Sequence, residues 1–173
     1  MPMRLSPLEP EDLDLLYTIE NDPALWSVGT ANVPYSRYAL RDYISGQQCD
    51  IYADRQVRLV VRIADGAARD KEVAIGLVDL VDFHPEHRRA EIGFALLREY
   101  REKGYGRQAI RLLLDYAGTI LHLHSVHAIV PHDNTASLAL LRTEGFTDGV
   151  TLTDWLLRSD GWHDALLLQK VFK

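Results

Sequence analysis

The sequence predicts a mixed α/β fold in which helices pack on one β-sheet. Four segments show the apolar period of an amphipathic helix, and seven others are strand-like. They follow one another in the order βααβββαβαββ, which is typical of one sheet covered by helices. Of the 173 residues, 47% are hydrophobic and 25% are charged, enough for one full core. We therefore expect residues 1–173 to form a single domain.

The N-terminal half contains residues that typically start or end helices. Pro10 is suited to opening a helix, and the run Asn21-Asp22-Pro23 is suited to ending it. Further on, the apolar period changes to two on either side of a polar turn, which predicts a β-hairpin. We expect a strand at 3–8, helices at 10–20 and 36–45, and hairpin strands at 57–63 and 73–81 around a turn at 65–71.

The C-terminal half has clearer signals. Ile110, Leu113, Leu114 and Ala117 lie on one face of a helix that follows the loop 101–106. Asn134 is suited to capping a second helix, which Gly145 would close. We expect strands at 89–97, 125–130, 150–157 and 165–172, with turns at 84–87 and 159–161.

Composition excludes several classes of protein. The 19 basic and 25 acidic residues give a net charge of −6, which disfavours general binding to nucleic acid or to an anionic membrane. Cys49 is the only cysteine, so no intrachain disulfide can form and a reducing compartment is expected. The sequence has no signal-peptide pattern and no apolar run that could cross a bilayer, so we expect a cytoplasmic protein. His122, His124 and His127 lack metal-ligand spacing, and we expect no metal.

The loop 101–107 is the first candidate binding site. Gly104 and Gly106 stand at the start of a predicted helix, among the cations Arg101, Lys103 and Arg107. Glycine allows close approach of backbone, and a helix start offers unpaired N–H groups, so this loop suits a phosphate. The alternative is an ordinary strand-to-helix turn with solvated charges. The loop is neither a dinucleotide fingerprint nor a P-loop.

Two motifs resemble those of the GCN5-related N-acetyltransferases, and the order of elements fits nearly the whole chain. The acetyl-CoA signature Arg/Gln-x-x-Gly-x-Gly/Ala is matched by Arg101, Gly104 and Gly106. The second motif, Asn-x-x-Ser/Ala followed by Gly-Phe, is matched by Asn134-Thr-Ala-Ser137 and Gly145-Phe146. Residues 76–82, 87–91 and 114–123 resemble the bacterial spermidine N-acetyltransferases. The ribosomal-protein N-terminal acetyltransferases share the Glu-Ile-Gly-Phe and Asn-x-x-Ser patterns.

The resemblance implies a mostly antiparallel central sheet with a V-shaped splay and acetyl-CoA as cosubstrate. The backbone N–H groups of Phe94, Ala95 and Leu96 would polarise the thioester carbonyl. The pantetheine would lie in the splay like an added strand. The residues expected to bind acetyl-CoA are these three together with Arg101, Glu102, Lys103, Gly104, Tyr105, Gly106, Arg107 and Asn134.

Transfer of acetyl to an amine needs a base, because at an unperturbed pKa near 10.4 only about one amine in a few thousand is neutral at pH 7. The resemblance assigns this role to Glu91, and the alternative is a structural ion pair with Arg88, Arg89 or another cation. At the position of the family's proton-donating tyrosine the chain has Leu141, which cannot donate a proton. Substitutes are Ser137, Tyr35 or Tyr38, unless Ser137 only bonds helix backbone or no acid is needed.

The acceptor stays open. Tyr35, Asp79 and Asp82 are the candidate substrate-binding residues, because they lie where the family places acceptor contacts, although Asp79 and Asp82 could be ordinary strand-edge charges. A polyamine or other small amine is slightly preferred over a protein N-terminus. A third alternative is a catalytically impaired module that binds acetyl-CoA. Self-association is compatible with the family.

Overall fold

The computed structural model describes residues 3–26, 33–64 and 72–173. In this part of the chain one seven-stranded sheet has the order β1-β2-β3-β4-β5-β7-β6. All neighbouring strands are antiparallel except β4 and β5. The strands are β1 (Arg4–Pro7), β2 (Val57–Ala64), β3 (Glu72–His84), β4 (Arg89–Leu96), β5 (Ser125–Pro131), β6 (Thr147–Arg158) and β7 (Gly161–Val171).

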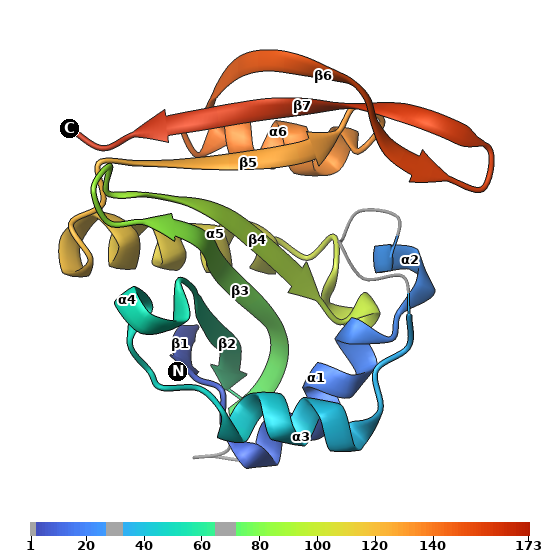
Figure 1. Cartoon of the computed structure of the whole chain (residues 1–173), viewed down its shortest axis with the longest axis vertical. Coiled ribbons are helices and arrows are strands. Elements are labelled where there is room, and N and C mark those ends of the chain that lie inside the picture. Colours follow the sequence, from blue (N-terminus) through green and yellow to red (C-terminus); the bar gives the residue numbers. More distant parts are fainter. Residues whose placement is uncertain (1–2, 27–32, 65–71) are drawn as a thin grey trace.

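Helices cover both faces of the sheet (Figure 1). On one face, α5 and α6 pack on the strands and bury the larger apolar core. On the other face, α1 and α3 bury a smaller core against β2, β3 and β4. The α-helices are α1 (Leu13–Glu20), α2 (Pro23–Trp26), α3 (Arg37–Ser45), α4 (Ile51–Asp54), α5 (Tyr105–Asp115) and α6 (Thr135–Thr143). Short 3₁₀ turns η1 (Pro10–Asp12) and η2 (Arg98–Tyr100) and a π-helical turn η3 (Tyr116–Ile120) accompany them.

The mixed α/β class and the order of the main elements are confirmed. Ile110, Leu113, Leu114 and Ala117 are all buried, as the apolar period predicts. The Asn134 side chain accepts a hydrogen bond from the backbone N–H of Ser137 at 3.1 Å and so caps α6.

The structure departs from the predicted elements at several points. The one-turn helices α2 and α4 were not predicted, because four residues are too few to show a helical period. The predicted helix 10–20 opens with the 3₁₀ turn η1. Strand β3 continues to His84 through an irregularity at Asp82, where φ is +50°. The predicted turn 65–71 lies outside the described residues.

The centre of the sheet opens between β4 and β5. These parallel strands pair only from Arg89 to Glu91 on β4, opposite Ser125 to His127 on β5. Beyond Glu91, β4 stays paired with β3 as far as Leu96, and β5 stays paired with β7 as far as Pro131. The two strands therefore diverge, as Figure 1 shows, which confirms the V-shaped splay.

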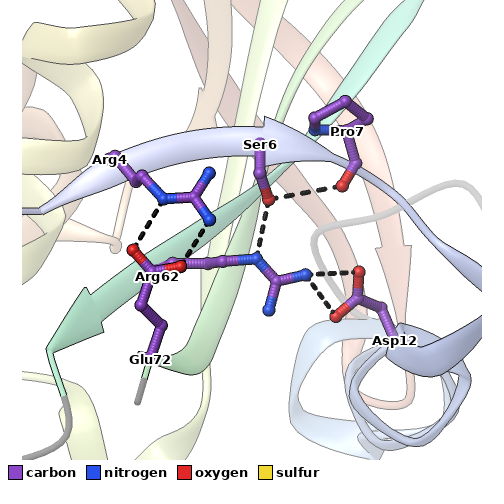
Figure 2. Close-up of polar contacts among 6 residues, drawn as sticks. All are labelled: Arg4, Ser6, Pro7, Asp12, Arg62 and Glu72. Atoms are coloured by element: carbon purple, nitrogen blue, oxygen red, sulfur yellow. Dashed lines mark hydrogen bonds and ion pairs between the residues drawn. The ribbon is translucent and has the colours of Figure 1, made fainter. Parts of the chain in front are cut away.

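A buried ion pair holds η1 against the N-terminal strands (Figure 2). Arg62 on β2 donates hydrogen bonds to both carboxylate oxygens of Asp12, at 2.8 and 2.7 Å, and to Ser6 Oγ at 2.7 Å. Arg4 pairs with Glu72 alongside it. Asp12 is buried, and a buried charge needs such a partner.

The described residues contain neither a membrane-spanning helix nor a metal-binding cluster. No helix there has both the length and the apolar character needed to cross a membrane. Nor do three or more His, Cys, Asp or Glu side chains converge there in a way that could hold a metal ion.

Candidate active site

A groove of about 640 Å³ opens beside the glycine-bearing loop, the end of β4 and α6. Most of the residues expected to bind acetyl-CoA line it, and Lys103 and Tyr105 do not. Lys103 instead lies over the ring of Tyr100, against which Tyr105 also packs. The expected residues along the groove are Phe94, Ala95, Leu96, Arg101, Glu102, Gly104, Gly106, Arg107 and Asn134, and Ser137 joins them.

The N-terminus of α5 opens onto this groove. Gly104 precedes the helix with φ +81°, a left-handed conformation that glycine adopts without strain. The first N–H groups of an 11-residue helix carry partial positive charge and lack partners within the helix. The loop can therefore receive an anionic group through its backbone.

Two of the three loop cations are already partnered on the protein side. Arg101 donates to the backbone oxygen of Leu96 at 2.8 Å and pairs with Asp22 at 3.2 Å. Arg107 pairs with the buried Glu144 at 2.5 Å. A guanidinium carries five N–H donors, so both arginines keep donors for the groove. The sequence pattern does not reveal Asp22 or Glu144, because both are distant from the loop along the chain.

Glu144 joins α5 to the end of α6. It accepts a second hydrogen bond from Arg111 at 2.8 Å, and its own backbone oxygen accepts one from Lys170 at 2.6 Å. Burial alone would raise the pKa of Glu144, but the hydrogen bonds and charges of Arg107 and Arg111 hold it below its usual value. Glu144 is therefore a charged anchor for the groove wall.

A second cavity, of about 430 Å³, lies on the α1 and α3 side of the sheet. It shares Leu25, Phe94 and Ala95 with the first groove, so the two cavities meet at β4. Of the candidate substrate-binding residues, Tyr35 and Asp79 line this cavity. Asp82 does not, because it stands exposed at the irregularity of β3.

A polar cluster forms one wall of the second cavity. Arg58 on β2 is the register partner of Asp79 on β3 and donates to both of its carboxylate oxygens, at 2.7 and 3.2 Å. The same guanidinium donates to Glu20 Oε1 at the end of α1, at 2.5 Å. Tyr43 lies beside it, with its ring centroid 5.6 Å from Arg58 Cζ. The sequence signals for this cluster are weak: Asp79 is a candidate acid on β3, and Arg58 is one of two arginines in the otherwise apolar strand β2.

The charges of this cluster support one another. Burial would lower the pKa of Arg58, but the neighbouring Asp79 outweighs it, and the pKa is raised. Arg58 therefore stays protonated throughout the physiological range. Burial also raises the pKa of the Tyr43 hydroxyl, which stays neutral.

Glu91 stands at the point where β4 and β5 separate. It is the last β4 residue paired with β5, and its register partner His127 places Nε2 at 3.7 Å from Glu91 Oε2. Neither Arg88 nor Arg89 forms an ion pair with it among the described residues. Because side chains alternate along a strand, Glu91 lies on the same sheet face as Gly93, whose register partner is Asp79. Glu91 lines neither cavity itself.

Leu141, at the position of the family's proton donor, is a core residue. Leu141 is fully buried in the larger core, whereas α6 turns Ser137, Leu140 and Thr143 toward the groove. Tyr38 is 78% exposed and lines neither cavity, so it is poorly placed for the role. Ser137, whose hydroxyl bonds no described residue, and Tyr35 are the substitutes that line a cavity.

Asn21, the residue that follows α1, fixes the backbone of Tyr35. Its N–H donates to Asn21 Oδ1 at 2.8 Å, and its carbonyl accepts from Asn21 Nδ2 at 3.1 Å.

Comparison with known proteins identifies the family to which this chain belongs. Residues 3–147 match the family model described as an acetyltransferase (GNAT) domain. The chain belongs to the GNAT acetyltransferase family. As a member of this family it is an N-acetyltransferase whose acyl donor is acetyl-CoA.

Relatives of this acetyltransferase confirm the resemblance to the spermidine branch. It is 30% identical over 149 residues to the spermidine N(1)-acetyltransferase of Escherichia coli (strain K12), spanning 84% of this chain and 73% of that protein. It is 29% identical over 163 residues to the enzyme of the same name from Vibrio cholerae, spanning 94% and 89%. The crystal structure of spermidine N-acetyltransferase from Vibrio cholerae in complex with CoA and spermine superposes with a TM-score of 0.84 at 26% identity, covering 98% of this chain and 95% of that one.

Proposed function

We propose that this acetyltransferase transfers the acetyl group of acetyl-CoA directly to a primary amine of a polyamine or a similar small amine, with residues 1–173 acting as one domain. The observation that carries the proposal is the meeting of the two cavities at Phe94 and Ala95. One cavity offers a helix N-terminus and arginines to an anionic cofactor. The other offers the carboxylates of Glu20 and Asp79 to a cationic acceptor.

The chemistry is aminolysis of a thioester. The neutral amine nitrogen attacks the carbonyl carbon, an amide forms, and the carbon–sulfur bond breaks to release CoA. The pantetheine would lie along the open edge of β4, where backbone N–H groups of Phe94, Ala95 and Leu96 could stabilise the oxyanion. The loop from Arg101 to Arg107 would hold the pyrophosphate, with Asn134 beside the groove.

Protons move at both ends of this reaction. Glu91, with His127 beside it, would accept the amine proton through water, since Glu91 does not line the cavities itself. Ser137 or Tyr35 could donate a proton to the departing thiolate. The lone Cys49 supports placing this reaction in the reducing cytoplasm.

Release of free thiol from acetyl-CoA tests the proposal. The panel comprises a linear diamine, spermidine, spermine, an aminoglycoside and peptides with free N-termini. We expect turnover with the polyamines. Turnover with peptides alone would make the protein an N-terminal acetyltransferase. Tight acetyl-CoA binding without thiol release from any acceptor would favour a catalytically impaired binding module.

A further inference from the structure

Arg58 is an unexpected side chain for a cavity that takes a cation. Its side chain is only 21% exposed, and its guanidinium is fixed by three hydrogen bonds to Glu20 and Asp79 and by the Tyr43 ring. Bidentate pairing to a register partner leaves it little freedom to move away. It therefore stays in the cavity wall as a permanent positive charge.

This charge limits the acidity of the cavity. Glu20, Arg58 and Asp79 are the only charged residues that line it within the described part of the chain. Two carboxylates and one guanidinium give a net charge of −1. Both oxygens of Asp79 are engaged by Arg58, whereas Glu20 Oε2 accepts a hydrogen bond from no described residue. One carboxylate oxygen is thus available to an ammonium group.

The surroundings of Glu20 suit a single ammonium group. The indole of Trp26 donates to the backbone oxygen of Glu20 at 2.9 Å, which holds the ring next to it. Tyr35 and Tyr43 line the same cavity. Aromatic faces attract an ammonium ion, and a carboxylate beside them completes a site for one charge.

Acceptor amines differ in the number of ammonium groups that remain besides the amine held at the thioester. A linear diamine then keeps one ammonium group, spermidine keeps two and spermine keeps three. We propose that Arg58 is a specificity-determining residue, which holds the acceptor cavity at one net negative charge and thereby favours a linear diamine over spermidine and spermine. This inference rests on the proposed function.

Binding calorimetry on the protein saturated with CoA tests the inference without turnover. The probes are 1,4-diaminobutane, spermidine and spermine, and the measured quantity is the ratio of the diamine Kd to the spermine Kd. Wild type should bind the diamine more tightly than spermine. Arg58→Gln should shift the ratio toward spermine by about tenfold, the effect of one charge at ion-pair distance in a partly hydrated cavity.

Two further variants separate charge from packing. Arg62→Gln removes an arginine of the same strand that is also bonded to a carboxylate (Figure 2) but does not line this cavity, so it should leave the ratio unchanged. Arg58→Lys keeps the charge and should keep the ratio near that of wild type. Equal shifts in Arg58→Gln and Arg62→Gln would overturn the proposal, as would a shift in Arg58→Lys as large as that in Arg58→Gln.

Glu20→Gln keeps the proposal testable if Arg58→Gln does not fold. Removing this carboxylate should weaken diamine binding about tenfold, and unchanged binding would overturn the proposal. Absence of amine binding to wild type would overturn it as well. The proposed function is judged separately, by thiol release, so the two can fail independently.

Discussion

Replacing the buried Glu144 by glutamine should destabilise the protein measurably at neutral pH. The Glu144 side chain is 7% exposed and accepts one hydrogen bond each from Arg107 and Arg111. A hydrogen bond to a charged group contributes about 1.5–3 kcal/mol. The two arginines are 48% and 58% exposed, so solvent screening reduces the sum. We expect a loss of about 2 kcal/mol, or a fall in Tm of roughly 4–8 °C.

The loss should depend on pH in a defined direction. The pKa of Glu144 is held below its ordinary value of 4.5 in the folded protein. Its stabilisation is therefore fully present above pH 4.5 and disappears as the pH falls through the folded-state pKa. Urea unfolding of wild type and Glu144→Gln at pH 7, 5 and 4 measures this. The difference in unfolding free energy should be largest at pH 7 and 5 and start to shrink at pH 4.

A matched control is the exposed pair of Asp148 and Arg142, joined by two hydrogen bonds at 2.9 and 2.7 Å. Because both side chains are about half exposed, Asp148→Asn should change stability much less than Glu144→Gln. Equal losses in the two variants would refute the reasoning from burial. A difference between wild type and Glu144→Gln that does not diminish in acid would refute the assignment to charge.

Three further predictions concern the core, the loop and the base. Leu141→Ala should lower the free energy of urea unfolding by about 2–5 kcal/mol, because it leaves a cavity at a fully buried site. Leu141→Tyr should overpack that site and not raise kcat. A higher kcat in this variant would contradict the placement of residue 141 in the core. Gly104→Ala should lower the free energy of unfolding by about 1–2 kcal/mol in thermal denaturation. No atom would clash with the new Cβ, so this cost comes only from the left-handed backbone, with φ +81°. Unchanged stability would show that the loop relaxes. Glu91→Gln should lower kcat/KM about 100-fold at pH 7 in the thiol-release assay, whereas an unchanged value would make Glu91 a structural partner of His127.

Local sequence determined most of the secondary structure. The apolar period of Ile110, Leu113 and Leu114 depends only on residues within two turns of each other, as does the Asn134 cap of α6. Gly104 precedes α5 and Gly106 lies in its first turn, so both act locally on that helix. For this reason the glycine-bearing loop could be predicted, from its residues and the family motifs, as a candidate acetyl-CoA site. The one-turn helices α2 and α4 are too short for any such period.

Tertiary structure alone decided the proposed acceptor cavity. Glu20, Arg58 and Asp79 come from α1, β2 and β3, and Arg58 lies 38 residues from Glu20 and 21 from Asp79 along the chain. Their meeting depends on strand register and on where α1 packs, which no local pattern encodes. The same holds for Leu141, which a motif alignment places at a catalytic position and packing places in the core. Periodicity and capping act between near neighbours, whereas a cavity and its charge arise from distant segments that pack together.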